Sequence, residues 1–342
     1  MKKERQLNIE TLRVFAIICT IMIHVTNVYF HKFLTISHSY YFFAVLFNSL
    51  ARICVPVFFM ISGSLLIPKE DSIEKYKKRI IKFLIVLIVW SIIYMLLYGR
   101  FTLKDVIITL YNGNSSSRHL WYMYALFGIY LTLPFIRKMC MNLSEKEENL
   151  FLILWGIFSG ILVIIIAISR EIINMNIDVS YPIPFVQAAY YLGYFICGHI
   201  LYKRYNNYKV KKHTNTYLII TYLVSSLITA LLTYFLSIKN NTDYDIFFWY
   251  KSIFIIISSA CIFLLFIINK EKFKSEKILL FSKYTFGIYL IHGVFFFYLR
   301  KLFTYTNYNS LYMCIPITIL LYFVSWLATY ILKKIPYINE LL

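Results

Sequence analysis

Long apolar segments recur along the whole 342-residue chain, and they restrict its fold more than any other feature. The sequence is 60% hydrophobic with a mean hydropathy of +0.67, whereas soluble domains are close to half apolar. Many of these segments approach the roughly 20 residues that an α-helix needs to cross a bilayer. A soluble core could not bury so many apolar surfaces, so the sequence predicts an all-α, polytopic membrane protein.

The spacing of the apolar segments predicts about ten transmembrane helices in one integral-membrane domain that covers residues 1–342. The polar segments between them are too short to hold a second folded domain, and the longest ends in the polar turn NGNSSSR. The first apolar run is too long for the core of a signal peptide, so it is predicted to be retained. The predicted spans lie near 7–30, 40–67, 79–98, 119–136, 149–169, 183–202, 216–236, 246–268, 278–299 and 310–332.

Basic residues set the predicted orientation. Most of the 35 lysines and arginines fall in alternate loops, and these loops are cytoplasmic if the N-terminus is placed inside. Ten spans then put both termini in the cytoplasm of a multi-pass protein of the cell (inner or cytoplasmic) membrane. The same rule explains the net charge of +19, because basic residues gather in the loops on the cytoplasmic side of the bilayer. The lipid bilayer is therefore the predicted partner, and no nucleic-acid partner is predicted.

The six cysteines lie mostly inside apolar stretches and show no CxxC spacing. They are therefore interpreted as small buried hydrophobic residues. Histidine, cysteine and carboxylate positions show no spacing typical of metal ligands, so no metal site is predicted.

Ionisable residues in the first span are the strongest functional signal, because charges inside a bilayer are costly. Eleven residues at about 100° each complete close to three helical turns. Arg13 and His24 therefore share one helix face, about 16 Å apart along the axis. Glu10 is placed to pair with Arg13. Arg13 alone could extend to the inner headgroups, but His24 has no equally easy route to water.

The second span contains Arg52 mid-way along its length and small residues further on. Ser62 and Gly63 fall near the level of Arg13, where small side chains admit either a ligand or a neighbouring helix. Pro56 should bend this span and free a carbonyl group. Arg52 is a candidate to bind substrate or stabilise an oxyanion, or else a structural partner in the bundle.

Two cations, Arg79 and Lys82, lie one turn apart at the start of the third span. Several cations at one level suit a polyanionic ligand, such as the phosphates of a coenzyme. The positive-inside rule explains the same residues without a ligand.

Aromatic residues and histidines gather in two further segments. In RHLWYMY, His119, Trp121 and Tyr122 fall at the predicted outer interface, where Trp121 is either a membrane anchor or a platform for a sugar ring. In SKYTFGIYLIH, Tyr289 and His292 lie deep in the ninth span, and His292 is either a substrate contact or an interhelical hydrogen-bonding residue.

Four of these elements, in this order, resemble acyltransferase family 3, a family of integral-membrane O-acyltransferases. The resemblance is closest to the branch that includes enterobacterial surface-antigen O-acetyltransferases. The third helix of the family typically carries an Arg-x-x-Arg pair, whereas this chain has Arg79-Ile-Ile-Lys82, which keeps the charge but loses the second guanidinium. The elements are ETLRVFAIICTIMIH, RICVPVFFMISGSLL, HLWYMYALFGIYLTLP and SKYTFGIYLIH.

The resemblance implies a bacterial enzyme that moves an acetyl or other small acyl group, such as succinyl, from cytoplasmic acetyl-CoA. The acceptor would be a hydroxyl of a cell-surface or lipid-linked glycan in the cell envelope, so that a polysaccharide is modified. The family pattern makes His24 catalytic and links Arg13 to handling of the acyl donor.

Some family members carry a C-terminal SGNH-type domain, which is not expected here because the chain ends about ten residues after the last span. Either the chain completes the transfer itself, or a separate transferase or polysaccharide-synthesis protein does.

The expected site therefore has three parts. Glu10 supports the catalytic pair in the first span, the donor part binds coenzyme A, and the acceptor part binds the glycan. The catalytic residues are His24, Arg13 and Glu10, the donor residues are Arg13, Arg79, Lys82, Ser62 and Gly63, and the acceptor residues are Arg52, His119, Trp121, Tyr122, Tyr289 and His292.

Two other classes of function remain open from the residues alone. The first is a flippase or exporter, in which the basic residues line a path for an anionic glycolipid. The second is a sensor or structural membrane protein, in which the polar residues are all interhelical contacts.

Overall fold

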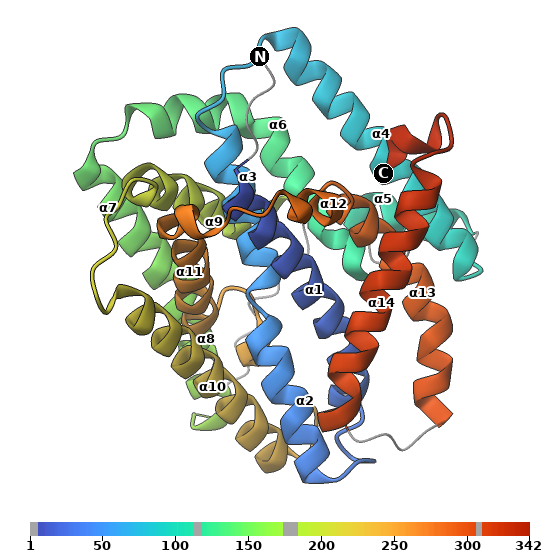
Figure 1. Ribbon diagram of the computed structural model, residues 1–342. Coiled ribbons are helices and arrows are strands. Elements are labelled where there is room, and N and C mark those ends of the chain that lie inside the picture. The colour runs from blue at the N-terminus through green and yellow to red at the C-terminus, as the bar shows by residue number, and fades with distance from the viewer. Residues whose placement is uncertain (1–5, 101, 113–117, 174–183, 306–309) are drawn as a thin grey trace.

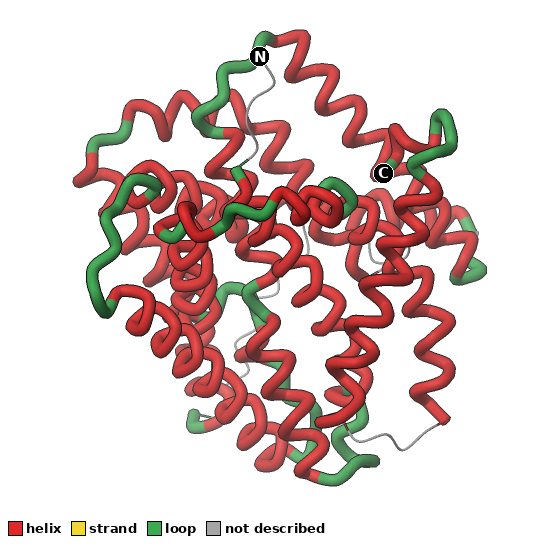
Figure 2. The backbone as a smooth tube through the Cα atoms, viewed as in Figure 1, coloured by secondary structure: helices red, strands yellow, loops and turns green. Residues whose placement is uncertain are grey.

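The computed structural model describes residues 6–100, 102–112, 118–173, 184–305 and 310–342. These residues form helices and connecting loops, with no strand among them (Figures 1 and 2). Most of the polar turn NGNSSSR, and the basic residues of the first five positions, lie outside the described residues. The C-terminal end lies in the upper right of the view in Figure 1.

The helix that carries Arg13 and His24, α1, is the centre of the bundle (Figure 1). Its neighbours surround it, so apolar residues are needed on nearly all of its faces, which explains its long apolar run. The helices packed against it are α2 (His38–Ala51), α3 (Cys54–Leu66), α11 (Ile253–Ile268), α12 (Leu279–Ser282), α13 (Thr285–Tyr305) and α14 (Ser310–Leu332), while α1 itself is Leu7–Phe30.

The predicted second span is divided into α2 and α3 at Arg52 and Ile53. Pro56 explains the position of this break. A proline has no N–H for the carbonyl four residues earlier, and its ring collides with that carbonyl, which here belongs to Arg52. The helical hydrogen bonds resume at once, since Val57 N–H donates to the Ile53 carbonyl. The break places Arg52 at a helix end in the middle of a 29-residue apolar span.

The remaining predicted spans each contain a helix or a helix pair. The helix α7 continues through a π-helical turn, Gly156–Ile161, into α8. One short helix, α5, occupies part of the predicted loop between the third and fourth spans. The bounds are α4 (Ile73–Leu97), α5 (Leu103–Asn112), α6 (Trp121–Asn142), α7 (Glu145–Trp155), α8 (Leu162–Glu171), α9 (Pro184–Tyr205) and α10 (Thr214–Asn240).

Among the described residues, seven helical segments are long and apolar enough to cross a membrane. An eighth is obtained if Glu276–Ser282 and Thr285–Arg300, which meet at 46°, form one bent span. Two helices in predicted spans, α6 and α9, are not among these segments. Both are rich in tyrosine and pack against each other and against other helices, and buried helix faces can be less apolar than faces that contact lipid.

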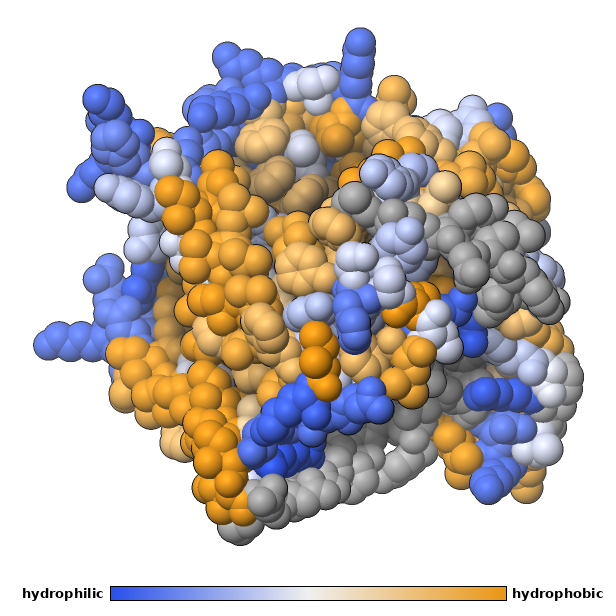
Figure 3. Space-filling model, turned by 90° about the horizontal axis from the view of Figure 1, so that it is seen from below, coloured by the Kyte–Doolittle hydropathy of each residue, from blue (hydrophilic) through white to orange (hydrophobic). Residues whose placement is uncertain are grey.

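The outer faces of several helices are apolar, as contact with lipid requires. In α4, Ile85, Ile88 and Ile92 are about half exposed, while Trp90 and Tyr94 point into the protein. Seen from below, hydrophobic side chains cover much of the described surface, with hydrophilic patches between them (Figure 3).

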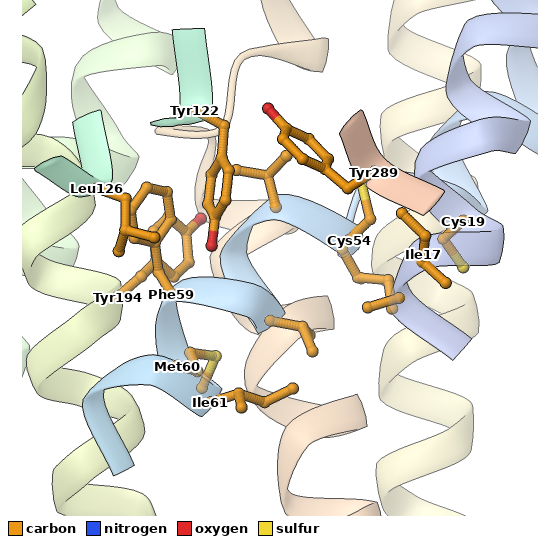
Figure 4. Close-up of a cluster of buried hydrophobic side chains, with 14 of the residues drawn as sticks. Ile17, Cys19, Cys54, Phe59, Met60, Ile61, Tyr122, Leu126, Tyr194 and Tyr289 are labelled. Carbon is orange, nitrogen blue, oxygen red and sulfur yellow. The ribbon is translucent and has the colours of Figure 1, made fainter. Parts of the chain in front are cut away.

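The core between α3 and α9 depends on two glycines. A Cβ on Gly63 would lie 1.7 Å from the Phe195 carbonyl oxygen, and one on Gly198 would lie 2.2 Å from the Met60 carbonyl oxygen. The two backbones are thus in direct contact, which is how small residues pack transmembrane helices. Beside this contact, Tyr122 lies between Phe59 and Tyr289 in the buried cluster of Figure 4.

Candidate active site

Three histidines from three separate elements meet beside the middle of the bundle. His24 comes from α1, His292 from α13, and His119 from the single 3₁₀ turn that leads into α6. The ring centroids are 5.2 Å apart for His24 and His292, 4.8 Å for His119 and His292, and 6.0 Å for His24 and His119. We call these residues the histidine cluster.

Burial differs within the histidine cluster. His119 and His292 are 6% and 1% exposed, whereas His24 is only partly buried although it lies on the central helix. The other two rings support the His24 ring from behind, together with Phe296, whose ring centroid is 5.9 Å from that of His24.

Tyrosine hydroxyls hold the backbone around the histidine cluster. Tyr289 donates a hydrogen bond to the His119 carbonyl, and Tyr94 of α4 donates one to the Leu290 carbonyl at 2.7 Å. His292 Nδ1 lies 3.1 Å from the Ile288 carbonyl, which can only accept, so Nδ1 carries the proton in this contact. His292 Nε2 is then the basic nitrogen, and it has no hydrogen-bond partner among the described residues.

Arg13 lies on α1 toward its N-terminal end, as predicted from the sequence. Its Nη1 donates to Glu10 Oε1 at 2.7 Å, and its side chain is 30% exposed while that of Glu10 is 9% exposed. Arg13 also interacts electrostatically with the hydroxyls of Tyr122 and Tyr130 from α6. Tyr122 contacts Tyr289, which in turn contacts His292. Polar side chains thus connect Arg13 to the histidine cluster through an otherwise apolar core.

A buried carboxylate organises the end of the bundle nearest the N-terminus. Asp71, in the loop before α4, has a side chain only 1% exposed. Its Oδ2 accepts from Arg79 at 2.8 Å and from Arg137 at 2.7 Å, and Lys69 lies 3.6 Å from Oδ1. Arg137 Nε also donates to the Leu66 carbonyl at 2.8 Å. We call Asp71, Arg79, Arg137 and Lys69 the Asp71 network, which joins the ends of α3, α4 and α6.

The Asp71 network keeps its carboxylate charged. Burial by itself raises the pKa of Asp71, but hydrogen bonds and charge from Arg137 and Arg79 outweigh it, and the pKa is lowered below its ordinary value. Arg79 is only partly satisfied by this pairing, because its Nη1 is buried without a hydrogen-bond partner among the described residues. Arg79 also interacts electrostatically with Tyr130, as Arg13 does, so both arginines face the same tyrosine.

The other predicted donor residues differ in their surroundings. Lys82 is exposed on α4, with no ion pair among the described residues. Ser62 lies close to the Tyr122 hydroxyl. Gly63 faces the Phe195 backbone, so its lack of a side chain serves helix packing on that face. The interpretation of Gly63 as helix packing is therefore the one that the geometry favours.

Of the predicted acceptor residues, Arg52 lies toward the other end of α1, whereas Tyr122 is close to Ser62 of the predicted donor part. Arg52 Nε donates to Asn48 Oδ1 at 2.7 Å, and the Asn48 amide reaches Thr26 and Asn27, which follow His24 on α1. The Arg52 guanidinium lies over the Phe248 ring at 4.4 Å. Trp121 packs against the rings of Tyr191 and Tyr250 at 5.1 and 5.8 Å.

Sequence reasoning missed several of these relations. It placed His119 at the membrane interface and did not bring it to His24. Asp71 and Arg137 were not singled out, although an aspartate between basic residues at the start of a span was a visible signal. No pattern in the sequence identified Tyr94, Tyr130 or Phe248.

The sequence matches the family model of the acyltransferase domain, acyltransferase family 3, over residues 6–333. The chain belongs to this family. The match covers nearly the whole bundle, including every element of the site described above, and it shows a membrane acyltransferase. No curated protein and no solved structure matches the sequence. The resemblance to the branch of surface-antigen O-acetyltransferases stays a prediction.

The side chains of this site are chemically suited to acyl transfer. A partly exposed imidazole can remove a proton or attack a carbonyl carbon. Arg13 of α1 and Arg79 of α4, at the other end of the bundle, can bind an anionic carrier of the acyl group. Among the described residues, no group of three or more histidine, cysteine or carboxylate side chains has a geometry that could hold a metal ion.

Proposed function

We propose that this acyltransferase moves an acetyl or other small acyl group from acyl-CoA to a hydroxyl of a cell-surface or lipid-linked glycan. The observation that carries the proposal is the series of contacts that runs from Arg13 through Tyr122 and Tyr289 to His292, whose ring lies beside that of His24. It joins a cationic end of the bundle to a reactive imidazole. The two ends are about 16 Å apart, roughly the reach of the pantetheine arm of coenzyme A.

The acyl donor would bind at the end that carries the Asp71 network, which the positive-inside rule assigns to the cytoplasm of a bacterial inner membrane. Arg79 and Arg13 would bind its phosphates. The buried Nη1 of Arg79 is a donor in need of an acceptor, and a phosphate oxygen supplies one. Asp71 holds this guanidinium in place, while the exposed Lys82 contributes general positive charge at the entrance.

His24 would carry out the transfer by one of two routes. As a general base, it takes the proton of the acceptor hydroxyl while that oxygen attacks the thioester carbon, and the C–S bond breaks. As a nucleophile, its nitrogen forms the bond to the acyl carbon and coenzyme A leaves, after which the acceptor oxygen displaces the imidazole. In both routes the free thiol receives the proton lost by the acceptor.

The acceptor would approach from the opposite end, past Arg52 and the aromatic side chains of Trp121, Tyr191 and Tyr250. Aromatic faces of this kind can support a sugar ring. His119, Tyr122, Tyr289 and His292 would form the wall against which the acceptor hydroxyl meets His24. A separate transferase or polysaccharide-synthesis protein would be needed only if the glycan must be delivered or the acyl group passed on.

The test is consumption of acetyl-CoA by the purified protein in nanodiscs, with a mixture of candidate glycans supplied. The wild-type protein should release free coenzyme A, while His24→Ala and Arg13→Ala should not. His213→Ala and Lys212→Ala are the controls, because both residues are exposed, lie just before α10 and are far in sequence from the residues of the site. Each variant must be recovered in the same yield and with the same thermal stability.

Two results would contradict the proposal. The first is a wild-type protein that neither binds nor consumes acetyl-CoA or another short-chain acyl-CoA. The second is full activity of His24→Ala in a folded protein. Either result would turn attention to the transport of an anionic glycolipid.

A further inference from the structure

Arg52 is a charge on the acceptor side of His24 to which the proposed reaction gives no chemical role. It lies in the middle of a 29-residue apolar span, where an arginine remains charged and is costly to bury. No carboxylate pairs with it among the described residues, although the other arginines near the site, Arg13, Arg79 and Arg137, each pair with one.

The contacts of Arg52 satisfy only part of the guanidinium. Its Nε is held by Asn48, and its charge is stabilised by the faces of Phe248 at 4.4 Å and Tyr250 at 5.7 Å. The two Nη groups, which form the fork that binds carboxylate or phosphate, have no partner among the described residues. The side chain is partly exposed, so this fork can be reached.

The position of the fork excludes the coenzyme phosphates as its partner. Arg52 reaches α1 through Asn48 at Thr26 and Asn27, beyond His24 from the donor end. Phe248, which lies under the guanidinium, packs against Phe30 at the far end of α1. Arg52 nevertheless interacts electrostatically with His24. An anion bound at Arg52 would therefore lie beside the hydroxyl that is acylated.

We propose that Arg52 binds a negatively charged group of the acceptor, so that the enzyme selects an acidic glycan or a phosphate-bearing glycan. Aromatic faces and a guanidinium fork together fit a ring that carries a carboxylate or phosphate close to the reacting hydroxyl. This inference rests on the proposed function, because it requires His24 to be the site of transfer.

The test compares matched acceptors with the wild-type protein in nanodiscs. One oligosaccharide contains glucuronate, the second is the same molecule with its carboxylates reduced to alcohols, and the third carries a phosphate ester on that neutral molecule. Binding is followed by quenching of tryptophan fluorescence and transfer by mass increase. The glucuronate or the phosphate form should bind at least about tenfold more tightly than the neutral form, and the better of the two identifies the anion.

The Arg52 variants then assign the preference to this residue. Arg52→Gln should reduce the preference for the anionic acceptor to less than about twofold, whereas Arg52→Lys, which keeps the charge but not the fork, should keep part of it. Lys104→Gln removes an exposed cation of α5 and should leave the preference unchanged. Arg52→Lys also serves as the test if Arg52→Gln fails to fold.

Three outcomes would overturn the inference. If the charged and neutral acceptors bind equally well, or if none of the three acceptors binds, no anion is selected. A preference that survives in Arg52→Gln places the anion site elsewhere. If Arg52→Gln loses acyl transfer to every acceptor and to water by the same factor, Arg52 stabilises the oxyanion that forms on the acyl group instead. The proposed function itself fails if the wild-type protein consumes no acyl-CoA or if folded His24→Ala is fully active, and both are measured separately.

Discussion

The Asp71 network and the histidine cluster lie at two levels of the same bundle, and they handle charge in opposite ways. In the Asp71 network, a nearly inaccessible carboxylate is surrounded by three cations. In the histidine cluster, the contacts of His24 and His292 described above are with aromatic rings and, for His292, with a backbone carbonyl. Fixed charges suit the binding of a fixed polyanion, whereas neutral imidazoles suit a group that must gain and lose a proton or an acyl group during one turnover.

The comparison also separates residues that contact a ligand from residues that hold those residues in position. His24 and Arg79 are the residues expected to act on a ligand, because His24 is only partly buried and Arg79 has an unpartnered Nη1 among the described residues. Asp71 and His292 are buried behind them. Substitutions at the two kinds of residue should therefore differ in size and in which kinetic constant changes.

The largest effect is expected within the histidine cluster. His24→Gln should lower the rate of acyl transfer at least about a thousandfold, because it removes the base or nucleophile. His119→Gln and His292→Gln should each cost only about tenfold, since they support the His24 ring without reacting. The measurement is kcat at saturating acetyl-CoA. If His292→Gln were as damaging as His24→Gln, the reactive imidazole would have been assigned to the wrong helix.

The next largest effect is expected at Asp71. Asp71→Asn leaves Arg79 and Arg137 without their shared anion, so we expect KM for acetyl-CoA to rise about thirtyfold with a smaller change in kcat. Glu148→Gln is the matched control, because the Glu148 side chain is also buried and pairs with two cations of another helix, Lys203 and Arg204 of α9. Both variants should lose thermal stability, but only Asp71→Asn should alter KM. An equal rise in KM for both would reduce Asp71 to a purely structural role.

A smaller effect is expected from changing the shape of the cation at Arg79. Arg79→Lys should raise KM for acetyl-CoA about tenfold, because a lysine cannot hold Asp71 and a phosphate with one planar group. Lys82→Ala should change KM less than about threefold, since Lys82 is exposed one turn away. The reverse order would mean that the phosphates bind on the outer face of α4.

The smallest effect is expected from pH. The pKa of Asp71 is lowered on folding, so its contribution to stability is complete above its ordinary pKa of 3.8 and is lost only as pH falls below that value. The difference in melting temperature between wild-type protein and Asp71→Asn should therefore be constant from pH 8 to about pH 5 and shrink in stronger acid. A difference that already shrinks near pH 6 would show that Asp71 is not held ionised by its arginines.

The sequence was sufficient where a local rule applied. The pairing of Glu10 with Arg13 follows from a spacing of three residues in a helix and is confirmed. The break in the second span is centred on the residue that loses its hydrogen bond to Pro56, as the chemistry of proline requires. The cysteines, interpreted as buried hydrophobic residues, are all free and buried.

The sequence was less informative where distant segments meet. His24, His119 and His292 are separated by 95 or more positions, and no periodicity within one helix can show that their rings converge. The ambiguity of Gly63 was resolved only by the approach of Phe195 from α9. Arg79 looked like one of many basic residues until Asp71 was found beside it.

The sequence by itself determined the class of the protein, its family and the helix face that joins Arg13 to His24, because apolar length, motif order and helical periodicity are local properties. Only the tertiary structure decided which polar groups share a site and which cations have an anion. Those properties depend on how helices pack across the bundle, because buried charges such as Asp71, Arg79 and Arg137 find their partners on other segments.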